Sequence, residues 1–483
     1  MATTKDLKHS TSDLKEKDDI EKTESVSSDH EDVNYDPAFV KRTLRRVDLR
    51  MLPLLGLLYA VALIDRTNLG IARIAGMELD LRLDIGERYS IASMIYFIPY
   101  TLLQIPGNLV LRRLGARNFM TICVVGWGAS QLGMAFVPTW GYLSLCRVFL
   151  GVFEAGFFPS LVFIITTWYQ RYEVQQRLAI FYLSSIIITS FSSIFAYGLT
   201  FLRGRGGLAG WAWIFLIEGL ITIVLGILAY LYVPDFPDKS KFLTEEERKM
   251  ILGRVQQDRG DSLPDKATGR KVWLHLRDPI VWAHSIMFMA TGVPAYAVGF
   301  FITIILAGMG YSTSEALLLT APPGLVAGIS CYCFARLADR TRKRAVWLAT
   351  QNVITIVGLA IAAYAKPHPV RYFGLFLTNM GATGCVPGVL AYSANNITSH
   401  SKRAVQTGLI IGMGGVAGII ATTAFRQKDF PRYVTGMWVA MGLQFTMLFL
   451  LAVLSYVYAR RNRLRREGKV GPLEGQENFF YTI

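Results

Sequence analysis

The sequence predicts an all-α membrane protein whose twelve transmembrane helices form two pseudo-symmetric halves of six. The first observation is composition: 52% of the 483 residues are hydrophobic and only 18% are charged, which is too apolar for an ordinary soluble protein of this length. The second is a series of twelve apolar runs of about 20 residues, the length that crosses a hydrocarbon core of about 30 Å. The third is a long polar break after the sixth run, which divides the series into two equal sets.

The runs are continuous stretches of apolar residues, whereas the strands of a membrane β-barrel would alternate apolar and polar residues, so helices are expected. The predicted spans are 51–73, 89–111, 118–137, 142–167, 177–201, 211–233, 281–307, 313–335, 345–364, 371–393, 404–425 and 435–458.

Basic residues predict the orientation. "KRTLRRVDLR" precedes the first span, "RRLGAR" follows the second, "RTRKR" the eighth, "SKR" the tenth and "RRNRLRR" the twelfth. These segments share one side if every run crosses once, and that side is cytoplasmic by the positive-inside rule. Two loops on the other side, 203–207 and 426–432, carry fewer basic residues. Both termini are therefore expected in the cytoplasm, and the net charge of +15 indicates loops that face anionic lipid rather than nucleic acid.

The domain organisation follows from the same pattern. The N-terminal segment is acidic and rich in serine, so it cannot bury a core and is expected to be a disordered cytoplasmic tail. It has no apolar signal-peptide region, which leaves the first span as the insertion signal. The predicted parts are the tail 1–40, a first half 41–233, a central cytoplasmic loop 234–280, a second half 281–459 and a cytoplasmic tail 460–483.

The central loop opens "VPDFPDKSKFLTEEERKM". Thr244 with Glu247 three residues later makes a capping box, which predicts a helix start. Apolar residues then recur on one face, so a short amphipathic helix on the cytoplasmic surface is expected. The residues of this face are Leu243, Met250, Ile251 and Val255.

Each half also carries a basic hairpin between its second and third spans, "NLVLRRLGARN" in the first and "ARLADRTRKRA" in the second. Matching features at matching places indicate a parallel duplication. With twelve spans in two halves, "ARLADRTRKR" at 335–344 resembles the hairpin signature of the major facilitator superfamily. The resemblance implies the major facilitator fold, secondary transport and a gating role for Asp339, Arg340 and Arg113. The first copy departs from the signature, with Arg112 at the usual aspartate position.

The fourth span contains "CRVFLGVFEAGFFP" at 146–159. Arg147, Gly151 and Glu154 stand at i, i+4 and i+7, so they share one helix face. A charge at the bilayer centre costs at least about 2.5 to 3.5 kcal/mol. This face is therefore expected to point at a partner or a wet cavity, with Gly151 leaving open space between the two charges.

The first span, "LLYAVALIDRTNLGIARI", adds Asp65 and Arg66. Adjacent helix residues point about 100° apart, so these two cannot pair with each other. Counting the helical rise from the span ends puts Asp65 almost level with Arg147, which predicts an ion pair between the first and fourth helices. Carboxylates that are paired and released can carry protons, and a freed guanidinium can bind a carboxylate at two points. The four charges therefore predict proton symport, although a purely structural network remains an alternative.

The segments "IDRTNLGIAR", "CRVFLGVFEAGFFP", "WIFLIEGL", "PDFPDKSKFLTEEE" and "SANNITSHSKR" together resemble the anion:cation symporter family. The resemblance implies proton coupling by Asp65 and Glu154 and substrate binding by Arg66 and Arg147. Asn68, in the same first-span segment, is assigned to the substrate as well. The seventh span has no arginine, so the second half is expected to contribute neutral groups, Tyr296 and Asn379, with Thr303 and Asn395 as further candidates. A structural role for each of these neutral groups remains an alternative.

The sequence is similar to the fungal branch of that family, which includes allantoate, pantothenate, biotin and nicotinate permeases. This implies uptake of a small organic anion, a carboxylate such as nicotinate, with protons. A monomer in the plasma membrane, without a cofactor or metal, is expected, and the vacuole and an oligomer remain alternatives. A proton-antiport exporter and a non-transporting nutrient sensor remain alternatives. The fifth span lacks the proline of the exporter signature, which disfavours export. An enzyme is disfavoured because no nucleophile and base, metal cluster or phosphate loop is evident.

Several other polar and aromatic residues have simpler interpretations. Glu218 in the sixth span is expected to be a structural carboxylate, and His284 to lie at the membrane interface. Tyr96, Phe97 and Tyr100 could stack on a ring-shaped substrate, but packing is the default expectation. The glycines at 408, 412, 414 and 418 predict close helix contact. The odd count of five cysteines argues against a disulfide framework, and the glycosylation pattern at Asn396 is expected to be unused.

Overall fold

The structure of the protein is a computed structural model that describes residues 35–234, 236, 237, 240, 242–260, 269–397, 400–474 and 479–482. The predicted disordered tail, 1–40, lies almost wholly outside the described residues. Residues 1–47 form one unit and residues 48–483 the other. The second unit contains the helical bundle.

Six helical segments make up the first half. In chain order they are α2 (Pro37–Ala72) with the π-helical turn η1 (Arg73–Met77) and α3 (Glu78–Asp80); α4 (Arg88–Met94), α5 (Phe97–Leu102) and α6 (Gln104–Leu114); α7 (Ala116–Met134); α8 (Trp140–Glu154) and α9 (Phe157–Trp168); α10 (Arg171–Ser190) and α11 (Ser192–Thr200); and α12 (Gly210–Tyr232).

Two helices, α13 (Glu245–Gly260) and α14 (Gly269–Leu276), lie in the connection to the second half. The second half again has six segments, which are α15 (Pro279–Gly308), α16 (Thr313–Leu318) with α17 (Ala321–Thr341), α18 (Arg344–Tyr364), α19 (His368–Asn395), α20 (His400–Ala424) and α21 (Val434–Arg466). Nine helical segments among the described residues are long and apolar enough by composition to cross a membrane. The predicted all-α architecture of two six-helix halves is confirmed.

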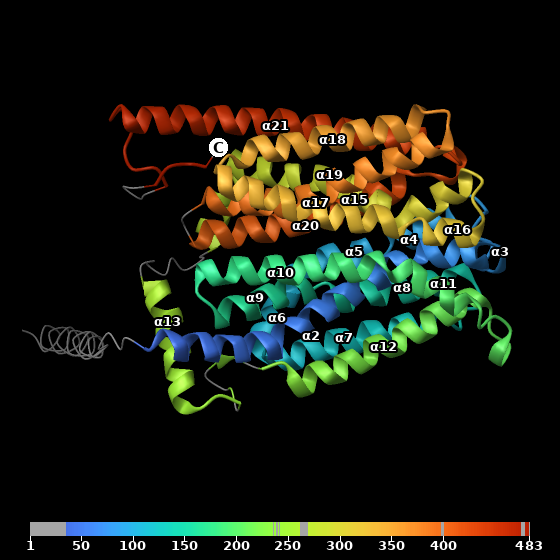
Figure 1. Ribbon diagram of the computed structural model, residues 1–483, viewed down its shortest axis with the longest axis horizontal. Coiled ribbons are helices and arrows are strands. Elements are labelled where there is room, and N and C mark those ends of the chain that lie inside the picture. Colours follow the sequence, from blue (N-terminus) through green and yellow to red (C-terminus); the bar gives the residue numbers. More distant parts are fainter. Residues whose placement is uncertain are drawn as a thin grey trace, which may run out of the picture. The chain divides into compact units, whose positions relative to one another are not determined.

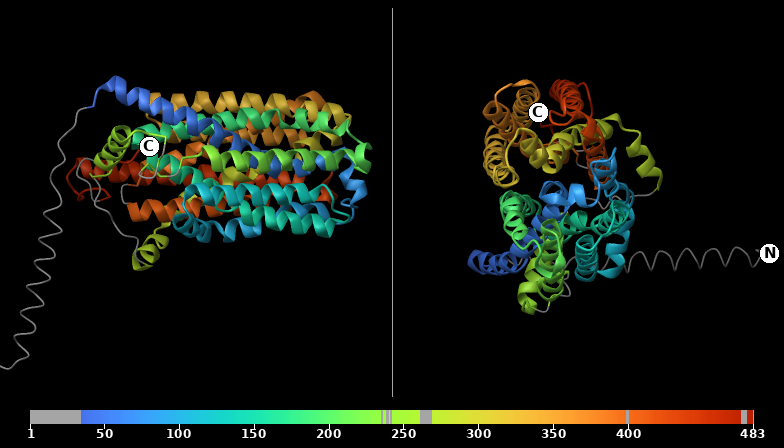
Figure 2. Two further views of the ribbon diagram at one scale, coloured as in Figure 1. Left: turned by 90° about the horizontal axis from the view of Figure 1, so that it is seen from below. Right: turned by 90° about the vertical axis from the view of Figure 1, so that its right-hand side faces the viewer.

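The two halves are visible as separate groups of helices, α4 to α12 in blue and green and α15 to α21 in yellow to red (Figures 1 and 2). They meet where α4 and α5 pack on α20, and where α10 and α11 pack on α17 and α16. These are the second segment against the eleventh and the fifth against the eighth. A parallel repeat relates the second segment to the eighth and the fifth to the eleventh, so the two contacts are equivalent under it.

Both basic hairpins reverse the chain at a residue with positive φ, Gly115 at 80° and Arg342 at 56°. Glycine reaches this region without strain, whereas a residue with a Cβ does so at a cost. The hairpins therefore share a positive φ at the turn, but their backbone conformations differ, with ψ at 157° for Gly115 and 19° for Arg342.

Glycines bring α20 against its neighbours at some positions and not at others. A Cβ on Gly418 would lie 2.1 Å from the Phe97 ring, and one on Gly414 would lie 2.9 Å from the Phe288 ring. At Gly408 and Gly412 an added Cβ would meet nothing within 4 Å. The prediction of close contact is confirmed for the second glycine pair and is wrong for the first.

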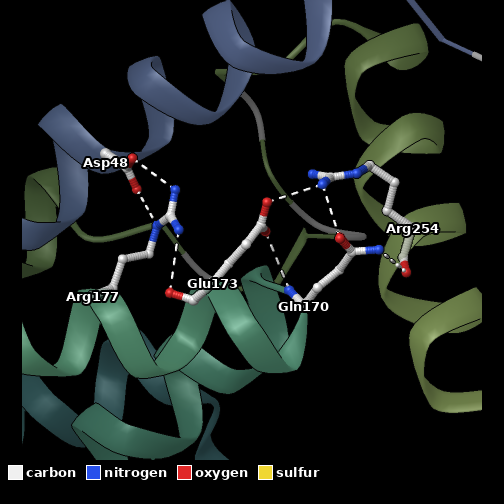
Figure 3. Close-up of polar contacts among 5 residues, drawn as sticks. All are labelled: Asp48, Gln170, Glu173, Arg177 and Arg254. Atoms are coloured by element: carbon white, nitrogen blue, oxygen red, sulfur yellow. Dashed lines mark hydrogen bonds and ion pairs between the residues drawn. The ribbon is translucent and has the colours of Figure 1, made fainter. Parts of the chain in front are cut away.

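Helix α13 is attached to the start of α10, as Figure 3 shows. The Arg254 guanidinium donates to Glu173 and to Gln170, each at 2.9 Å. Next to this pair, Arg177 of α10 holds Asp48 of α2 at 2.6 Å. The predicted capping box is present, because the Glu247 N–H donates to Thr244 Oγ1 and the Thr244 N–H donates to Glu247 Oε2. The predicted apolar face is buried throughout, at Leu243, Met250, Ile251 and Val255.

Candidate functional site

Arg66 of α2 lies at the centre of a buried polar cluster. Its Nη2 forms an ion pair with Glu154 Oε1 at the end of α8, and its Nη1 donates to the Tyr296 hydroxyl on α15 at 3.1 Å. The guanidinium carbon lies 5.4, 5.0 and 5.9 Å from the ring centroids of Tyr96, Tyr100 and Tyr296. These are cation–π distances, so the cation is enclosed by three aromatic rings as well as held by a carboxylate. The cluster of these five residues is called the Arg66 site below.

The Arg66 site depends on a break in the second segment. Helix α4 ends at Met94 and α5 begins at Phe97. Tyr96 and Tyr100 are four residues apart across this start and stack with ring centroids 5.5 Å apart. The Tyr96 hydroxyl donates to Glu154 Oε2 at 2.7 Å, so both oxygens of this carboxylate have a donor.

Gly151 brings α8 into contact with this break. A Cβ at Gly151 would lie 2.2 Å from the Tyr96 carbonyl oxygen. The prediction that Gly151 leaves open space between Arg147 and Glu154 is therefore wrong, because the backbone of Tyr96 fills that space. Its function is to permit a close helix approach.

The predicted ion pair between Asp65 and Arg147 is absent from the described residues. Asp65 Oδ2 accepts hydrogen bonds from Trp127 Nε1 at 3.1 Å and Thr222 Oγ1 at 3.0 Å. Arg147 donates to the Arg66 carbonyl at 3.3 Å. The rotation of α2 about its axis explains the difference, because it directs Asp65 toward α7 and α12, whereas Arg147 reaches the backbone at Arg66.

Arg147 is completely buried, and its guanidinium makes few hydrogen bonds. Its guanidinium carbon lies 5.3 Å from the Tyr96 ring centroid, and its Nε and Nη1 have no hydrogen-bond partner within the described part of the chain. A buried guanidinium with two unused N–H groups is suited to an anion.

Asn68 contacts a different residue from Arg66. Its amide donates to Glu218 Oε2 on α12, and both side chains are buried. The structure therefore places Asn68 against Glu218 rather than within the Arg66 site. The role of Asn68 in substrate binding stays a prediction.

The second-half candidates are spread over the fold. Only Tyr296 reaches Arg66. Asn379 on α19 accepts a hydrogen bond from Thr383 at 3.0 Å, and Thr303 donates to the Gly70 carbonyl at 3.2 Å. Asn395 is exposed.

The predicted gating residues lie at the hairpins. Asp339 at the end of α17 pairs with Arg344 at the start of α18 at 2.7 Å, so it joins two helix ends of the second half. Arg340 is exposed. Arg113 belongs to α6, and its side chain lies outside the described residues. The gating roles stay predictions.

The sequence analysis did not predict that three aromatic residues contact the buried charges. These residues are Tyr96, Tyr100 and Trp127. Tyr96 and Tyr100 were weighed only as general stacking groups, although their four-residue spacing next to a proline was a usable signal. Trp127 gave no signal, since a tryptophan in an apolar span is ordinary. His284 is fully buried within the protein, and its Nδ1 donates to the Ile280 carbonyl at 2.9 Å. Its expected position at the membrane interface stays a prediction.

The chain belongs to the major facilitator superfamily, because the family model described as "Major Facilitator Superfamily" matches residues 55–422. The major facilitator-type transporter hxnP of Emericella nidulans is 32% identical over 432 residues, 86% of each chain. The high-affinity nicotinic acid transporter of Saccharomyces cerevisiae is 28% identical over 423 residues, 87% of this chain and 78% of the relative. Among solved structures, a bacterial homologue of the human lysosomal transporter Spinster in an inward-facing, unoccupied conformation superposes with a TM-score of 0.64 at 16% identity, over 88% of this chain and 98% of the other.

The protein is thus an integral multi-pass membrane protein and a transporter for small molecules, and it groups with fungal permease-like members of the superfamily. The prediction of a transporter rather than an enzyme is confirmed, since these relatives are named as transporters.

Proposed function

We propose that the protein is a proton-coupled symporter that takes up a small organic anion, a carboxylate such as nicotinate. The observation that carries the proposal is the Arg66 site, where one guanidinium is held by Glu154 and surrounded by Tyr96, Tyr100 and Tyr296. A cation within aromatic rings suits a planar anion, because the charge pairs with the carboxylate while the rings stack on the substrate. The similarity to a nicotinic acid transporter supports the same class of substrate.

The proposed cycle begins at Glu154. While this carboxylate is ionised it occupies Nη2 of Arg66. Protonation removes its charge, so the guanidinium loses its internal counter-ion and can take a substrate carboxylate bidentately. Proton and anion therefore bind together, which is the requirement for symport. Asp65 is assigned as a second proton-carrying group, and Arg147 as a second cation for the anion.

Tyr296 connects substrate binding to the movement of the halves. Arg66 belongs to the first half and Tyr296 to the second, and they share a hydrogen bond of 3.1 Å. A substrate bound to Arg66 either replaces the hydrogen bond with Tyr296 or makes a further contact beside it. The binding energy of the substrate therefore differs between arrangements of the two halves. Such a difference is what a ligand needs to shift a conformational equilibrium.

The remaining assignments belong to the same proposal. Asp339, Arg340 and Arg113 gate the hairpin side, both termini face the cytoplasm, and a monomer works in the plasma membrane. The division into 1–40, 41–233, 234–280, 281–459 and 460–483 describes its parts.

The test is the substitution Glu154→Gln. Glutamine imitates the protonated carboxyl group but cannot release a proton, so substrate exchange should persist while accumulation driven by a pH gradient is lost. The assay is uptake of labelled nicotinate into proteoliposomes, measured both as counterflow and under an imposed pH gradient.

The matched control is Glu218→Gln, the same change at a buried glutamate that contacts Asn68. It should retain accumulation driven by the pH gradient. Normal uphill uptake by Glu154→Gln would remove Glu154 from the proton pathway, and the proposal would lose its main support.

A further inference from the structure

The C-terminal segment of the chain folds back onto the second half. After α21 the chain reverses, and its C-terminal end lies beside α21 (Figure 1). Leu473 and Tyr481 are both 5% exposed and belong to one apolar cluster with core residues of α15, α18, α19 and α21. The described residues 473, 474 and 479–482 are called the strap below.

Two asparagine side chains hold the backbone of the strap. Asn462 of α21 accepts from the Tyr481 N–H at 2.9 Å and donates to the Tyr481 carbonyl at 2.8 Å. Asn396, just after α19, accepts from the Thr482 N–H at 2.8 Å and donates to the Thr482 carbonyl at 3.2 Å. A carboxamide that hydrogen-bonds both the N–H and the C=O of one residue recognises the peptide backbone, whatever side chain that residue carries.

One aromatic side chain of the strap occupies a defined place. The Tyr481 ring stacks on Tyr458 with centroids 4.4 Å apart and planes 10° apart. Its hydroxyl donates to Glu474 at 3.0 Å and accepts from Arg461 at 3.3 Å. The neighbouring Phe480 is 43% exposed, so adjacent residues of the strap face opposite directions.

A lysine fixes the other end of the strap. Lys402 at the start of α20 lies 2.8 Å from Asp278, the residue before α15, and 3.1 Å from Glu474. Burial alone would lower the pKa of Lys402, but the two carboxylates outweigh it and raise that pKa. The Asp278 carboxyl, whose burial opposes ionisation, has a lowered pKa because Lys402 and the Ile280 N–H donate to it. Both shifts favour the charged forms of Lys402 and Asp278, which supports the ion pair between them.

We propose that these residues form a peptide-binding site whose ligand is the chain's own C-terminal segment, and that the bound strap joins the helix ends of the second half into one rigid body. Its direct partners come from three places in that half, the end of α19, the start of α20 and the end of α21. Lys402 in turn holds Asp278 at the start of α15. The site thereby gives a role to Asn396 and Lys402, two residues of the "SANNITSHSKR" segment that substrate binding leaves unexplained. The Asn396 side chain, which a glycan would otherwise modify, is engaged in its hydrogen bonds with Thr482.

The inference does not depend on the identity of the substrate. Transport by rocking needs each half to move as a unit. A strap that binds three helix ends of one half, and is linked through Lys402 to a fourth, supplies that rigidity without joining the two halves. Loss of the strap should therefore loosen the second half and slow transport of any substrate, while the Arg66 site stays intact.

The first experiment uses the full-length protein in detergent and measures hydrogen exchange at the amides of Tyr481 and Thr482. Both should exchange at least about tenfold more slowly than in a free peptide of residues 472–483, because their N–H groups are held by buried asparagines. Exchange at the free-peptide rate in the unsubstituted protein would overturn the proposal, whatever any variant does.

The second experiment compares Tyr481→Ala with Phe480→Ala, a control of similar size on the exposed side of the strap. Tyr481→Ala should abolish the protection at Thr482, lower the melting temperature and slow transport, whereas Phe480→Ala should change none of these. A fluorescent peptide of residues 472–483 should bind to Tyr481→Ala saturably and restore its melting temperature, and the same peptide with alanine in place of Tyr481 should not. Equal effects of the two substitutions, or no difference between the two peptides, would refute a specific site.

Discussion

Arg66 and Arg147 are two buried guanidinium groups of the first half with different degrees of pairing. Arg66 has a carboxyl partner, Glu154, and a hydroxyl partner, Tyr296. Among the described residues, the contacts of the Arg147 guanidinium are a backbone carbonyl and the face of the Tyr96 ring. Because an uncompensated charge in a membrane is costly, the less satisfied cation, Arg147, has more to gain from an incoming anion. In the proposed cycle, the availability of the paired cation, Arg66, depends on protonation of Glu154.

Arg66→Lys should weaken carboxylate binding by about tenfold or more. The ammonium keeps the positive charge but cannot pair with two oxygens in one plane, and the loss of one charge-assisted hydrogen bond costs about 1.5 to 3 kcal/mol. Inhibition of labelled nicotinate uptake by unlabelled nicotinate would give the apparent affinity. An affinity equal to that of the parent protein would shift the anion site to Arg147 or elsewhere.

The charged residues of the two spans could be predicted from the sequence, but not all of the residues that they contact. Arg66 and Glu154 could be found because ionisable residues in apolar spans are rare. The pairing of Asp65 with Arg147 was wrong because counting helical rise gives depth along a span, whereas partner choice also depends on the rotation of each helix. The donors to Asp65, Trp127 and Thr222, are neutral side chains, so a search for charged residues does not single them out.

Helix α8 crosses the second segment at a point set by one glycine. The site needs the Tyr96 hydroxyl at 2.7 Å from Glu154, and this requires the backbones to approach within the space that a Cβ at Gly151 would occupy. Glycine therefore acts here through packing, in a helix interior where it is otherwise unfavourable.

Gly151→Ala should destabilise the protein by about 1 to 3 kcal/mol through overpacking and reduce transport strongly, since the added methyl group would push Tyr96 away from Glu154. The control is Gly412→Ala, also inside a transmembrane helix, where the new Cβ meets nothing within 4 Å. Thermal melting in detergent and uptake assays measure the two effects. If both alanine variants melt and transport alike, the close approach at Gly151 is not required.

The sequence predicted whole helices better than the breaks within them. The twelve spans and the start of α13 follow from apolar length and from the capping box of Thr244 and Glu247. The breaks at Ile95–Tyr96, Leu103 and Ala155–Gly156 lie inside continuous apolar runs, where hydropathy does not change. Those breaks position Tyr96 and end α8 at Glu154, so the features that shape the site were the least visible in the sequence.

The two halves are held together at the end where α2 leads into η1. Arg73 there pairs with Gln427 of the second half, Tyr89 donates to the Phe300 carbonyl at 3.3 Å, and Thr303 donates to Gly70 at 3.2 Å. Nearby, the Thr320 hydroxyl at the start of α17 contacts the Ser193 hydroxyl at the start of α11. These contacts must break if the halves rock to open this end, as alternating access requires.

A disulfide between cysteines placed at Ser193 and Thr320 should therefore stop transport. The two side-chain oxygens are in hydrogen-bond contact, so thiols at the same positions come within bonding reach. The double variant, made with the exposed Cys333 changed to serine, should lose transport on mild oxidation and regain it with reductant. Each single cysteine variant, treated identically, should keep transport in both conditions. Full transport with the disulfide formed would mean that this interface stays closed throughout the cycle, and the opening movement would then have to occur entirely at the opposite end of the helices.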